Sequence, residues 1–362
     1  MESENKIPQE VAERVKKENE ETVNVYELKN QYYQMLNGML PIVDKIMNFF
    51  STDSILPEDT VKDLVKNAVE VAKYLENCIF RKEFFSENYQ KLICNLKEEG
   101  NSAKWQQDMK EMLLHMRENM VLAIQQAEKQ RYTCCCCKQR NFFLAFTKYY
   151  DYMQEYYGGI PWKHETQNSE NMVCPACGSF DRERLIVLAL QREELKQKRI
   201  LQIAPSNAID NFLKSQENAG YDTCDLFMEG VTFKADLQHM DMVEKESYDI
   251  WICSHVLEHV KDDKKAMEEL YRITKKGGYG LVLVPIDLNQ KETEEEWGRP
   301  EEECWRRFGQ DDHTRKYAKH DFIKRLELAG FEVEELNRDI FGEEVFQMNA
   351  LSDTSVLYKA KR

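Results

Sequence analysis

The sequence predicts an α/β protein in which a parallel-rich sheet fills the C-terminal half, preceded by a small cysteine module and an N-terminal bundle of helices. Three patterns support this prediction. Apolar residues recur at helical spacing from about 22 to 130, two Cys-x-x-Cys pairs follow, and short β-rich runs alternate with helical stretches from Arg199 onward. A chain of 362 residues is long enough for several cores. The predicted domains are residues 1–130, 131–180 and 181–362.

The composition describes an acidic protein without a membrane segment. The formal net charge is −15, which repels phosphate backbones and disfavours nucleic acid as a partner. No apolar run reaches the roughly 18 residues that a membrane span needs. The first residues, MESENKIPQEVAERVKKENEE, are charged throughout and lack the apolar stretch of a secretory signal. We therefore expect a cytoplasmic protein.

The N-terminal region combines apolar and charged residues with the period of a helix. Pro41 is expected to kink or break the first helix, and Pro57 to start a second. A further helix is expected over about 82–97, and Ser102 is placed to cap the last one. These segments predict an antiparallel bundle of three or four helices. The alternative is that the same apolar stripes are coiled-coil seams, which would make the bundle a homodimer interface or a surface for a protein partner.

Two cysteine pairs predict a metal site. Cys134 and Cys137 have the two-residue gap of a Cys-x-x-Cys turn, and so have Cys174 and Cys177. Four thiolates suit a tetrahedral zinc ion and leave no open position for water, so the predicted role is structural. The two cysteines inside the first pair would then point away. The alternative is that the pairs are simply buried thiols. We expect zinc to organise the aromatic segment between the pairs.

From Arg199 onward, short β-rich runs are separated by helical segments of about a dozen residues, which is the pattern of βαβ units and a mostly parallel sheet. The expected strands are residues 199–204, 221–226, 231–236, 248–254, 279–285 and 331–336. The expected helices end near Ala219, span 262–274 and lie around 321–329.

A nucleotide cofactor site is expected where these strands end. Ligands of an open parallel sheet bind outside the carboxyl ends of the strands, where the strand order reverses. The first strand runs into Ala204, Pro205 and Ser206 before a helix, where backbone N–H groups would meet the cofactor. Asp225 is placed for the ribose hydroxyls and Asp236 for the adenine amine, although each acid has an alternative role as a helix cap or surface residue. The further candidates are Leu226, Leu237, Ser254, His255 and His259.

Four segments carry a resemblance to a known family: CPACGSFDRERL, ILQIAPSNAI, YDIWICSHVLEHVKDDKKAMEELYRITKKGGYGLVLVPI and RRFGQDDHTRKYAKHDFIKRLELAGFEV. Through them, residues 174 to about 335 resemble the class I S-adenosylmethionine-dependent methyltransferases, in particular a type 11-like group found with bacterial surface-polysaccharide genes. The resemblance implies a Rossmann-like methyltransferase domain, S-adenosylmethionine as cofactor and a carbohydrate-like acceptor. It does not extend to residues 1–130.

The first loop of the sheet departs from the pattern of that family. Most class I methyltransferases have a glycine-rich turn after the first strand, because glycine lets the backbone approach the cofactor closely. This chain has no glycine between Arg199 and Ala219. Asn207 is the expected substitute, because asparagine adopts the left-handed backbone conformation more readily than most residues.

Two histidines are the predicted catalytic residues. Methyl transfer to an oxygen needs in-line geometry and often a base, and His255 directly follows the fourth strand while His313 lies in the insertion after the fifth. His255 and His259 are four residues apart with Glu258 between them, which also admits a metal site. The sequence shows no third ligand, so a structural role is favoured. For His313 the alternative is a solvated surface turn.

These patterns together predict an S-adenosylmethionine-dependent methyltransferase that acts on an oxygen of a saccharide or a related small polar acceptor. One alternative is a cofactor-binding scaffold with weak or no activity, which the missing glycines favour. The other is an RNA methyltransferase whose zinc module grips the substrate. For the latter, Lys138, Arg140, Lys148 and Lys163 provide only a sparse positive surface.

Overall fold

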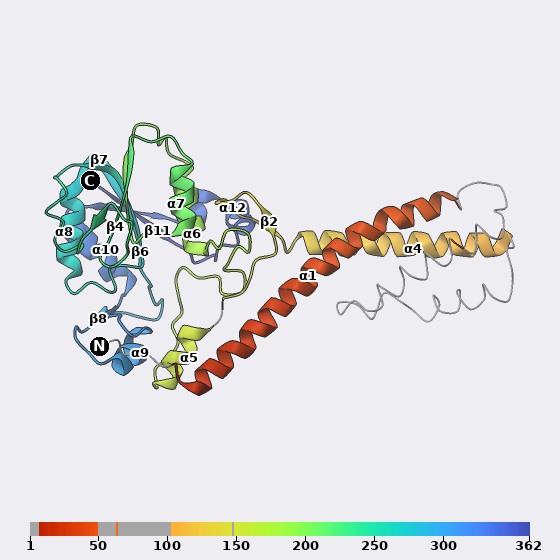
Figure 1. Cartoon of the computed structure of the whole chain (residues 1–362), viewed down its shortest axis with the longest axis horizontal. Coiled ribbons are helices and arrows are strands. Elements are labelled where there is room, and N and C mark those ends of the chain that lie inside the picture. The colour runs from red at the N-terminus through yellow and green to blue at the C-terminus, as the bar shows by residue number, and fades with distance from the viewer. Residues whose placement is uncertain (1–6, 50–62, 64–102, 147) are drawn as a thin grey trace. The chain divides into compact units, whose positions relative to one another are not determined.

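The computed structural model describes residues 7–49, 63, 103–146 and 148–362 (Figure 1). The chain divides into two compact units, one made of Met1–Val23 with Tyr132–Arg362 and the other of Asn24–Arg131. We call them the sheet unit and the helical unit. The cysteine segment belongs to the sheet unit, so the module expected at residues 131–180 does not stand apart in this division.

The helical unit contains α4 (Ala103–Glu128) and the part of α1 (Gln9–Phe49) that follows Val23. None of the described helices is long and apolar enough to cross a membrane. The helices expected after Pro57 and over 82–97 lie outside the described residues. The buried core of the unit consists of Leu36, Val43, Ile46, Met109, Leu113, Met116, Met120 and Ala123.

The helix α1 continues through Pro41, so the predicted break at this residue is wrong. A proline inside a helix removes a backbone hydrogen bond and costs about 3 kcal/mol. Leu36 and Val43, on either side of Pro41, are 1% and 0% exposed in the core shared with α4. Full burial of each such side chain stabilises by about 1.5–3 kcal/mol, which offsets the cost of the proline.

The sheet unit is built on seven strands in the order β10-β11-β7-β6-β3-β4-β5. All neighbours from β7 to β5 pair in parallel, and β11 runs antiparallel between β10 and β7. The predicted parallel-rich α/β class is confirmed, and a strand was found at each expected place, whereas β11 was not expected. The bounds are β3 Arg199–Ile203, β4 Gly220–Asp225, β5 Phe233–Lys234, β6 Tyr248–Ser254, β7 Thr274–Leu283, β10 Glu332–Leu336 and β11 Leu357–Lys361.

Two apolar cores cover the two faces of this sheet. On one face, α8 (Asp263–Ile273) and α10 (Lys319–Leu328) pack over Trp251. On the other, α6 (Asp181–Leu190) and α7 (Asn207–Lys214) pack over Ile250. Gly280 in β7 lies so close to the Trp251 ring that a Cβ there would come within 2.0 Å of it. Glycine is therefore required at this position of the strand.

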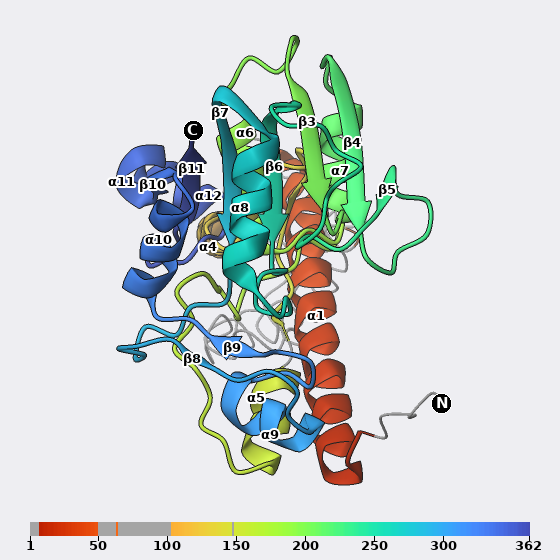
Figure 2. The same ribbon diagram turned by 90° about the vertical axis from the view of Figure 1, so that its left-hand side faces the viewer.

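Several short elements lie beyond one edge of the sheet. Figure 2 shows that β3 and β4 point toward them. One follows the first cysteine pair, and the others form the insertion between β7 and α10. They are α5 (Tyr149–Tyr156), β8 (Glu294–Glu295), α9 (Glu301–Phe308) and β9 (Arg315–Lys316). The edge that they cover is the one at which parallel sheets bind their ligands.

The cysteine segment is fixed to the sheet unit by Arg184 of α6. Its buried guanidinium donates hydrogen bonds to the carbonyls of Met172, Ser179 and Asn349 at 2.7–2.8 Å. The side chain of Asn349 in turn accepts a hydrogen bond from the backbone N–H of Cys135 at 3.0 Å. These bonds join the cysteine turns to the C-terminal part of the chain. The remaining elements are β1 (Tyr132–Thr133), β2 (Arg140–Asn141), α11 (Arg338–Phe341) and α12 (Glu343–Met348).

Candidate functional site

The strand order reverses between β3 and β6. From β3 the chain adds β4 and β5 on one side, and then places β6 and β7 on the other. The loops that follow β3 and β6 therefore begin side by side at the carboxyl edge of the sheet. Residues predicted from these two strands, Ala204 to Ser206 and Ser254 with His255, meet at this switch point, which is where ligands of such sheets bind.

Ala204 and His255, directly after β3 and β6, both have a left-handed backbone, with φ of 48° and 56°. For a residue with a Cβ this conformation costs about 1–3 kcal/mol and concentrates at ligand sites. Asn207 is instead the first residue of α7, so the expectation that it takes the left-handed position is wrong. The loop obtains the backbone of a glycine turn from an alanine, next to the half-buried Pro205.

Two hydroxyl groups in these loops lack partners. The Oγ atoms of Ser206 and Ser254 are buried, and no described residue forms a hydrogen bond with either of them. Ser206 precedes α7 at the N-cap position, yet its side chain does not cap the helix. Because buried polar groups in proteins nearly always have a partner, these hydroxyls fit a polar ligand that binds between the loops.

Asp225, the last residue of β4, keeps part of its carboxylate available. Its Oδ1 accepts the backbone N–H groups of Phe227 and Met228 at 2.7 Å each. No described residue donates a hydrogen bond to its other oxygen, Oδ2, which leaves that oxygen for a ligand hydroxyl. Leu226 is 47% exposed, so its side chain also remains available to a ligand.

Asp236 and Leu237, two and three residues beyond β5, already contact other parts of the protein. The Asp236 carboxylate accepts hydrogen bonds from the backbone N–H and side-chain amide of Gln238 at 2.9–3.0 Å. Leu237 is 5% exposed and belongs to the apolar core under α8 and α10. Gln238 thus donates hydrogen bonds to the Asp236 carboxylate, and the side chain of Leu237 lies in the apolar core. Strand order predicts the position of a residue in the fold but not the side chains that contact it.

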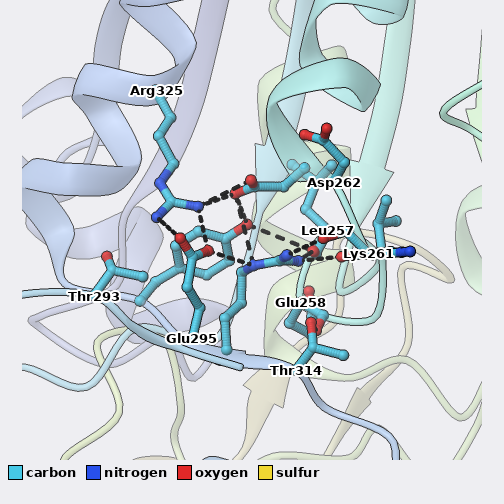
Figure 3. A network of polar contacts seen from close by, with 12 residues as sticks. Leu257, Glu258, Lys261, Asp262, Thr293, Glu295, Thr314 and Arg325 are labelled. Atoms are coloured by element: carbon cyan, nitrogen blue, oxygen red, sulfur yellow. Dashed lines mark hydrogen bonds and ion pairs between the residues drawn. The ribbon is translucent and has the colours of Figure 1, made fainter. Parts of the chain in front are cut away.

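Arg315 of β9 holds the insertion against the loop that follows β6. The guanidinium donates hydrogen bonds to three backbone carbonyls of that loop (Figure 3), those of Leu257, Val260 and Lys261. Beside it, Thr314 donates from its N–H and its hydroxyl to the carbonyl of Glu258, at 3.0 and 3.1 Å. The segment that carries His313 is therefore bound directly to the segment that carries Glu258 and His259.

The charge of Arg315 is balanced within the same network. Asp263 lies 3.8 Å and Glu295 3.3 Å from its Nε. Both acids also pair with Arg325, at 2.7 and 2.8 Å, and the hydroxyl of Tyr317 donates to Asp263 at 2.6 Å. Because Arg315 and Asp263 are each 3% exposed in their side chains, the centre of this network is shielded from solvent and holds the insertion against the loop after β6.

Glu258, His259 and His313, here called the histidine cluster, come together next to this network. Their candidate ligand atoms all lie within 4.8 Å of one another. Burial raises the pKa of Glu258 to about 7 and lowers that of His313 to about 3. Nδ1 of His255 lies 3.5 Å from Oε1 of Glu258, so both predicted catalytic histidines adjoin the same carboxylate. The third ligand that the sequence did not show is His313, which only the fold brings to Glu258.

A cavity of about 310 Å³ lies against the histidine cluster and His255. The segment between the cysteine pairs supplies aromatic lining residues, and the indole N–H of Trp162 is buried there without an acceptor among the described residues. Arg182 of α6 also lines the cavity. The sequence indicates the aromatic segment but does not indicate Trp162 and Arg182 as site residues, because only their place around the cavity reveals them. The aromatic lining residues are Phe146, Tyr150, Trp162, Phe180 and Phe308.

The four predicted metal ligands, here called the cysteine cluster, also come together. Cys134, Cys137, Cys174 and Cys177 place their sulfur atoms within 4.8 Å of one another. Cys135 is directed elsewhere, since its thiol donates to the carbonyl of Arg184 at 3.3 Å. The chain thus forms two potential metal-binding clusters: one joins the two ends of the aromatic segment, and the other adjoins the cavity that this segment lines.

Comparisons with known proteins yield one family match and several distant structural likenesses. Residues 190–282 match the model of a methyltransferase-domain family. A search of curated proteins found no match. The chain is similar to an S-adenosylmethionine-dependent methyltransferase from Mesorhizobium loti, at 14% identity over 50% of this chain and 98% of that one, with a TM-score of 0.38.

Two further solved structures are similar to about half of this chain at low sequence identity. A methyltransferase from Archaeoglobus fulgidus is 15% identical over 50% of this chain and 94% of that one, with a TM-score of 0.32. The 1,6-didemethyltoxoflavin-N1-methyltransferase of Burkholderia thailandensis, solved with its substrate and S-adenosylhomocysteine, is 11% identical over 50% and 74%, with a TM-score of 0.29.

Proposed function

We propose that this chain, which carries a class I S-adenosylmethionine-dependent methyltransferase domain, methylates an oxygen of a saccharide or a related small polar acceptor. The observation that carries the proposal is the cavity of about 310 Å³ against His255 and His313. Concave sites of this size, lined by aromatic faces and a few polar groups, bind small molecules. Aromatic faces pack on the C–H faces of sugar rings, while polar groups bind the hydroxyls.

The polar groups of the cavity suit an uncharged acceptor with several hydroxyls. The unused indole N–H of Trp162 is a donor for one of them. Charges of both signs line the cavity, with Lys148 and Arg182 opposed by Asp151 and Glu165. An RNA backbone would need an excess of positive charge, so this lining favours the saccharide over the RNA alternative.

The switch point fits the adenosyl cofactor. When bound, S-adenosylmethionine supplies a methyl group that is activated by a positively charged sulfur. The hydroxyls of Ser206 and Ser254 would form hydrogen bonds with the cofactor. Oδ2 of Asp225 would accept a hydrogen bond from the ribose, and the exposed side chain of Leu226 would lie beside the cofactor. Asp236 would bind the adenine amine with acceptor capacity that Gln238 leaves unused.

His255 is the proposed base. It follows the strand that ends at the switch point, and burial lowers the pKa of its imidazole well below the usual range. The ring is therefore neutral at physiological pH, and the lone pair of one ring nitrogen is the proposed acceptor of the proton that an acceptor hydroxyl loses on methylation.

The cysteine cluster is proposed to hold structural Zn²⁺. The sulfur atoms of Cys134 and Cys177 are 3.7 Å apart, and those of Cys137 and Cys174 are 3.8 Å apart. Zinc–sulfur bonds of about 2.3 Å give a tetrahedron with edges of about 3.8 Å. The donor set and its spacing therefore fit the ion, which would hold together the two ends of the aromatic segment that lines the cavity.

The helical unit is proposed to bind a second copy of the chain or a protein partner. Val25, Ile42, Leu114 and Leu122 are 44–51% exposed on its helices, which supports such a surface. Light scattering of the full chain tests the homodimer, and a monomeric mass at all concentrations would leave a different protein as the partner.

The test of the enzymatic proposal combines calorimetry and methyl transfer. We expect one S-adenosylmethionine to bind per chain, and labelled methyl groups to appear on members of a panel of free and lipid-linked saccharides. Asp225→Ala should weaken cofactor binding by about tenfold, which corresponds to the loss of a hydrogen bond to a charged group. The matched control is Asp241→Ala, an exposed acid away from the strand ends. Absence of cofactor binding would contradict the proposal and favour the scaffold.

A further inference from the structure

The carboxylate of Glu258 lacks the partners that a buried acid needs. Its side chain is 0% exposed, and no described residue forms a hydrogen bond with either oxygen. The nearest candidate donors are Nδ1 of His255 at 3.5 Å and Nε2 of His259 at 3.9 Å. Buried side-chain oxygens in proteins nearly always have a hydrogen-bond partner. The arrangement leaves both oxygens of Glu258 available to a bound cation.

The two imidazoles beside Glu258 are held by their far nitrogen atoms. Nδ1 of His313 lies 3.0 Å from the carbonyl oxygen of Phe308, and Nδ1 of His259 lies 3.1 Å from Oδ2 of Asp312. Because both oxygens are acceptors, each Nδ1 carries a proton, and Nε2 is the nitrogen of each ring that is left to bind an ion. Metal-binding histidines are almost always oriented in this way, by a carbonyl or a carboxylate on the second nitrogen.

The two imidazole rings of the cluster meet edge to face. The rings of His259 and His313 are nearly perpendicular, at 83°, with centroids 4.6 Å apart. They do not stack, and their ligand atoms and that of Glu258 lie within 4.8 Å of one another. The hydrogen bonds of Thr314 and Arg315 to the loop after β6 hold the two ligand-bearing segments together without any ion. The cluster is therefore preassembled.

We infer that Glu258, His259 and His313 form a site for a divalent transition-metal ion in the wall of the acceptor cavity. Two imidazoles and a carboxylate are a donor set that such ions take, and three protein ligands leave positions open for a substrate. The part of the inference that concerns the reaction rests on the proposed function, whereas the metal site itself does not.

The open position would bind the acceptor oxygen. A metal ion lowers the pKa of a bound hydroxyl, as it does for bound water. The O–H bond breaks and its proton passes to His255 or to water. The oxygen then forms a bond to the methyl carbon, and the electron pair of the broken carbon–sulfur bond stays on sulfur. The products are a methyl ether, S-adenosylhomocysteine and a proton.

The experiment titrates Mn²⁺ into the full chain and follows free Mn²⁺ by electron paramagnetic resonance. Mn²⁺ prefers nitrogen and oxygen donors, so it reports on the histidine cluster and not on the thiolates. We expect one Mn²⁺ per chain. Glu258→Gln and His313→Ala should weaken its binding by about 100-fold, and Asp312→Asn, which removes only the orienting carboxylate, by about tenfold. The matched control is His320→Ala, since His320 is 68% exposed and outside the cluster.

Each outcome bears on the inference. Absence of Mn²⁺ binding in the wild-type chain, or unchanged binding in Glu258→Gln, would overturn it. If Glu258→Gln and His313→Ala fail to fold, Asp312→Asn carries the test, because Asp312 is 63% exposed and its replacement leaves the core intact. If Mn²⁺ binds but S-adenosylmethionine does not, the proposed function is contradicted, whereas the metal site is supported. Equal turnover of the metal-free and loaded protein would overturn the role of the ion in the reaction.

Discussion

The cysteine cluster joins the ends of the aromatic segment and the histidine cluster adjoins the cavity that this segment lines, yet the two clusters are built in opposite ways. The cysteine cluster joins two local turns of identical donors, and its four thiols leave no open position. The histidine cluster joins mixed donors from segments 54 residues apart in the chain, His259 and His313, and leaves positions open. A closed cluster contributes to folding, whereas an open cluster next to a cavity contributes to chemistry.

The strongest way to separate the two clusters is to remove a thiol. Cys174→Ser should destabilise the sheet unit by about 4 kcal/mol or more, because binding free energy at a structural zinc site is folding free energy. Thermal melting should fall by roughly 10 °C or more, since a unit of this size loses about 2–4 °C per kcal/mol.

The matched control for this change is Cys304→Ser. Cys304 is also buried, with 5% of its surface exposed. Among the described residues, however, its thiol donates a hydrogen bond only to the carbonyl of Arg299, at 3.7 Å. Its replacement should shift the melting temperature by less than about 3 °C, as expected for a loss below about 1 kcal/mol. Equal shifts in the two variants would show that the cysteine cluster carries no metal-dependent stability.

The next largest effect should come from the network that assembles the histidine cluster. Arg315→Met removes the donors to the carbonyls of the loop after β6 and leaves the acids of the network with less positive charge. Breaking such a buried pair costs about 3–5 kcal/mol. We expect weaker Mn²⁺ binding and a lower melting temperature, with the zinc content unchanged.

Zinc content measured by mass spectrometry distinguishes this variant from Cys174→Ser. A matched control is Arg338→Met. The side chain of Arg338 is 40% exposed, and among the described residues its only ion-pair partner is the exposed Asp353. Loss of zinc in Arg315→Met would mean that the two clusters are not independent.

The same contrast explains how much the sequence could predict. The spacing of Cys134, Cys137, Cys174 and Cys177 is a local property, and so is the alternation of strands and helices that predicts the sheet. The switch point followed from strand order, which put Ser206, Ser254 and Asp225 at one edge. These features depend on short stretches of chain whose geometry is independent of the rest.

What the sequence could not predict depends on side chains from distant segments. No periodicity links His259 to His313, and contacts such as the hydrogen bonds of Thr314 and Arg315 to the loop after β6 bring them together. The side-chain amide of Gln238 donates a hydrogen bond to Asp236, and strand order does not predict this contact. Pro41 stays inside α1 because the tertiary core on both sides of it outweighs a local preference.

A smaller effect on free energy is expected at the reaction itself. His313→Ala should lower kcat by about 100-fold, equal to about 2.7 kcal/mol, and change the affinity for S-adenosylmethionine by less than about threefold. The reason is that His313 lines the cavity and lies in the insertion, away from the strand ends at which the cofactor is proposed to bind. Calorimetry and steady-state kinetics on the same preparation check this split. Unchanged turnover would remove His313 from the reaction and return it to a purely structural position.

The smallest effect concerns the loop that has no glycine. Ala204 holds a left-handed backbone, with φ of 48°, and a Cβ in that conformation costs about 1–2 kcal/mol. Ala204→Gly removes this strain but adds about 0.5–1 kcal/mol of chain entropy to the cost of folding, so a net stabilisation of about 0.5–1 kcal/mol is expected. Cofactor affinity should stay the same, because the backbone already has the shape that a glycine would take. Ala208→Gly, inside α7, is the matched control and should destabilise by a similar amount. If Ala204→Gly instead weakened cofactor binding more than about tenfold, the methyl group of Ala204 would itself be part of the binding surface, since an effect of that size exceeds the backbone terms.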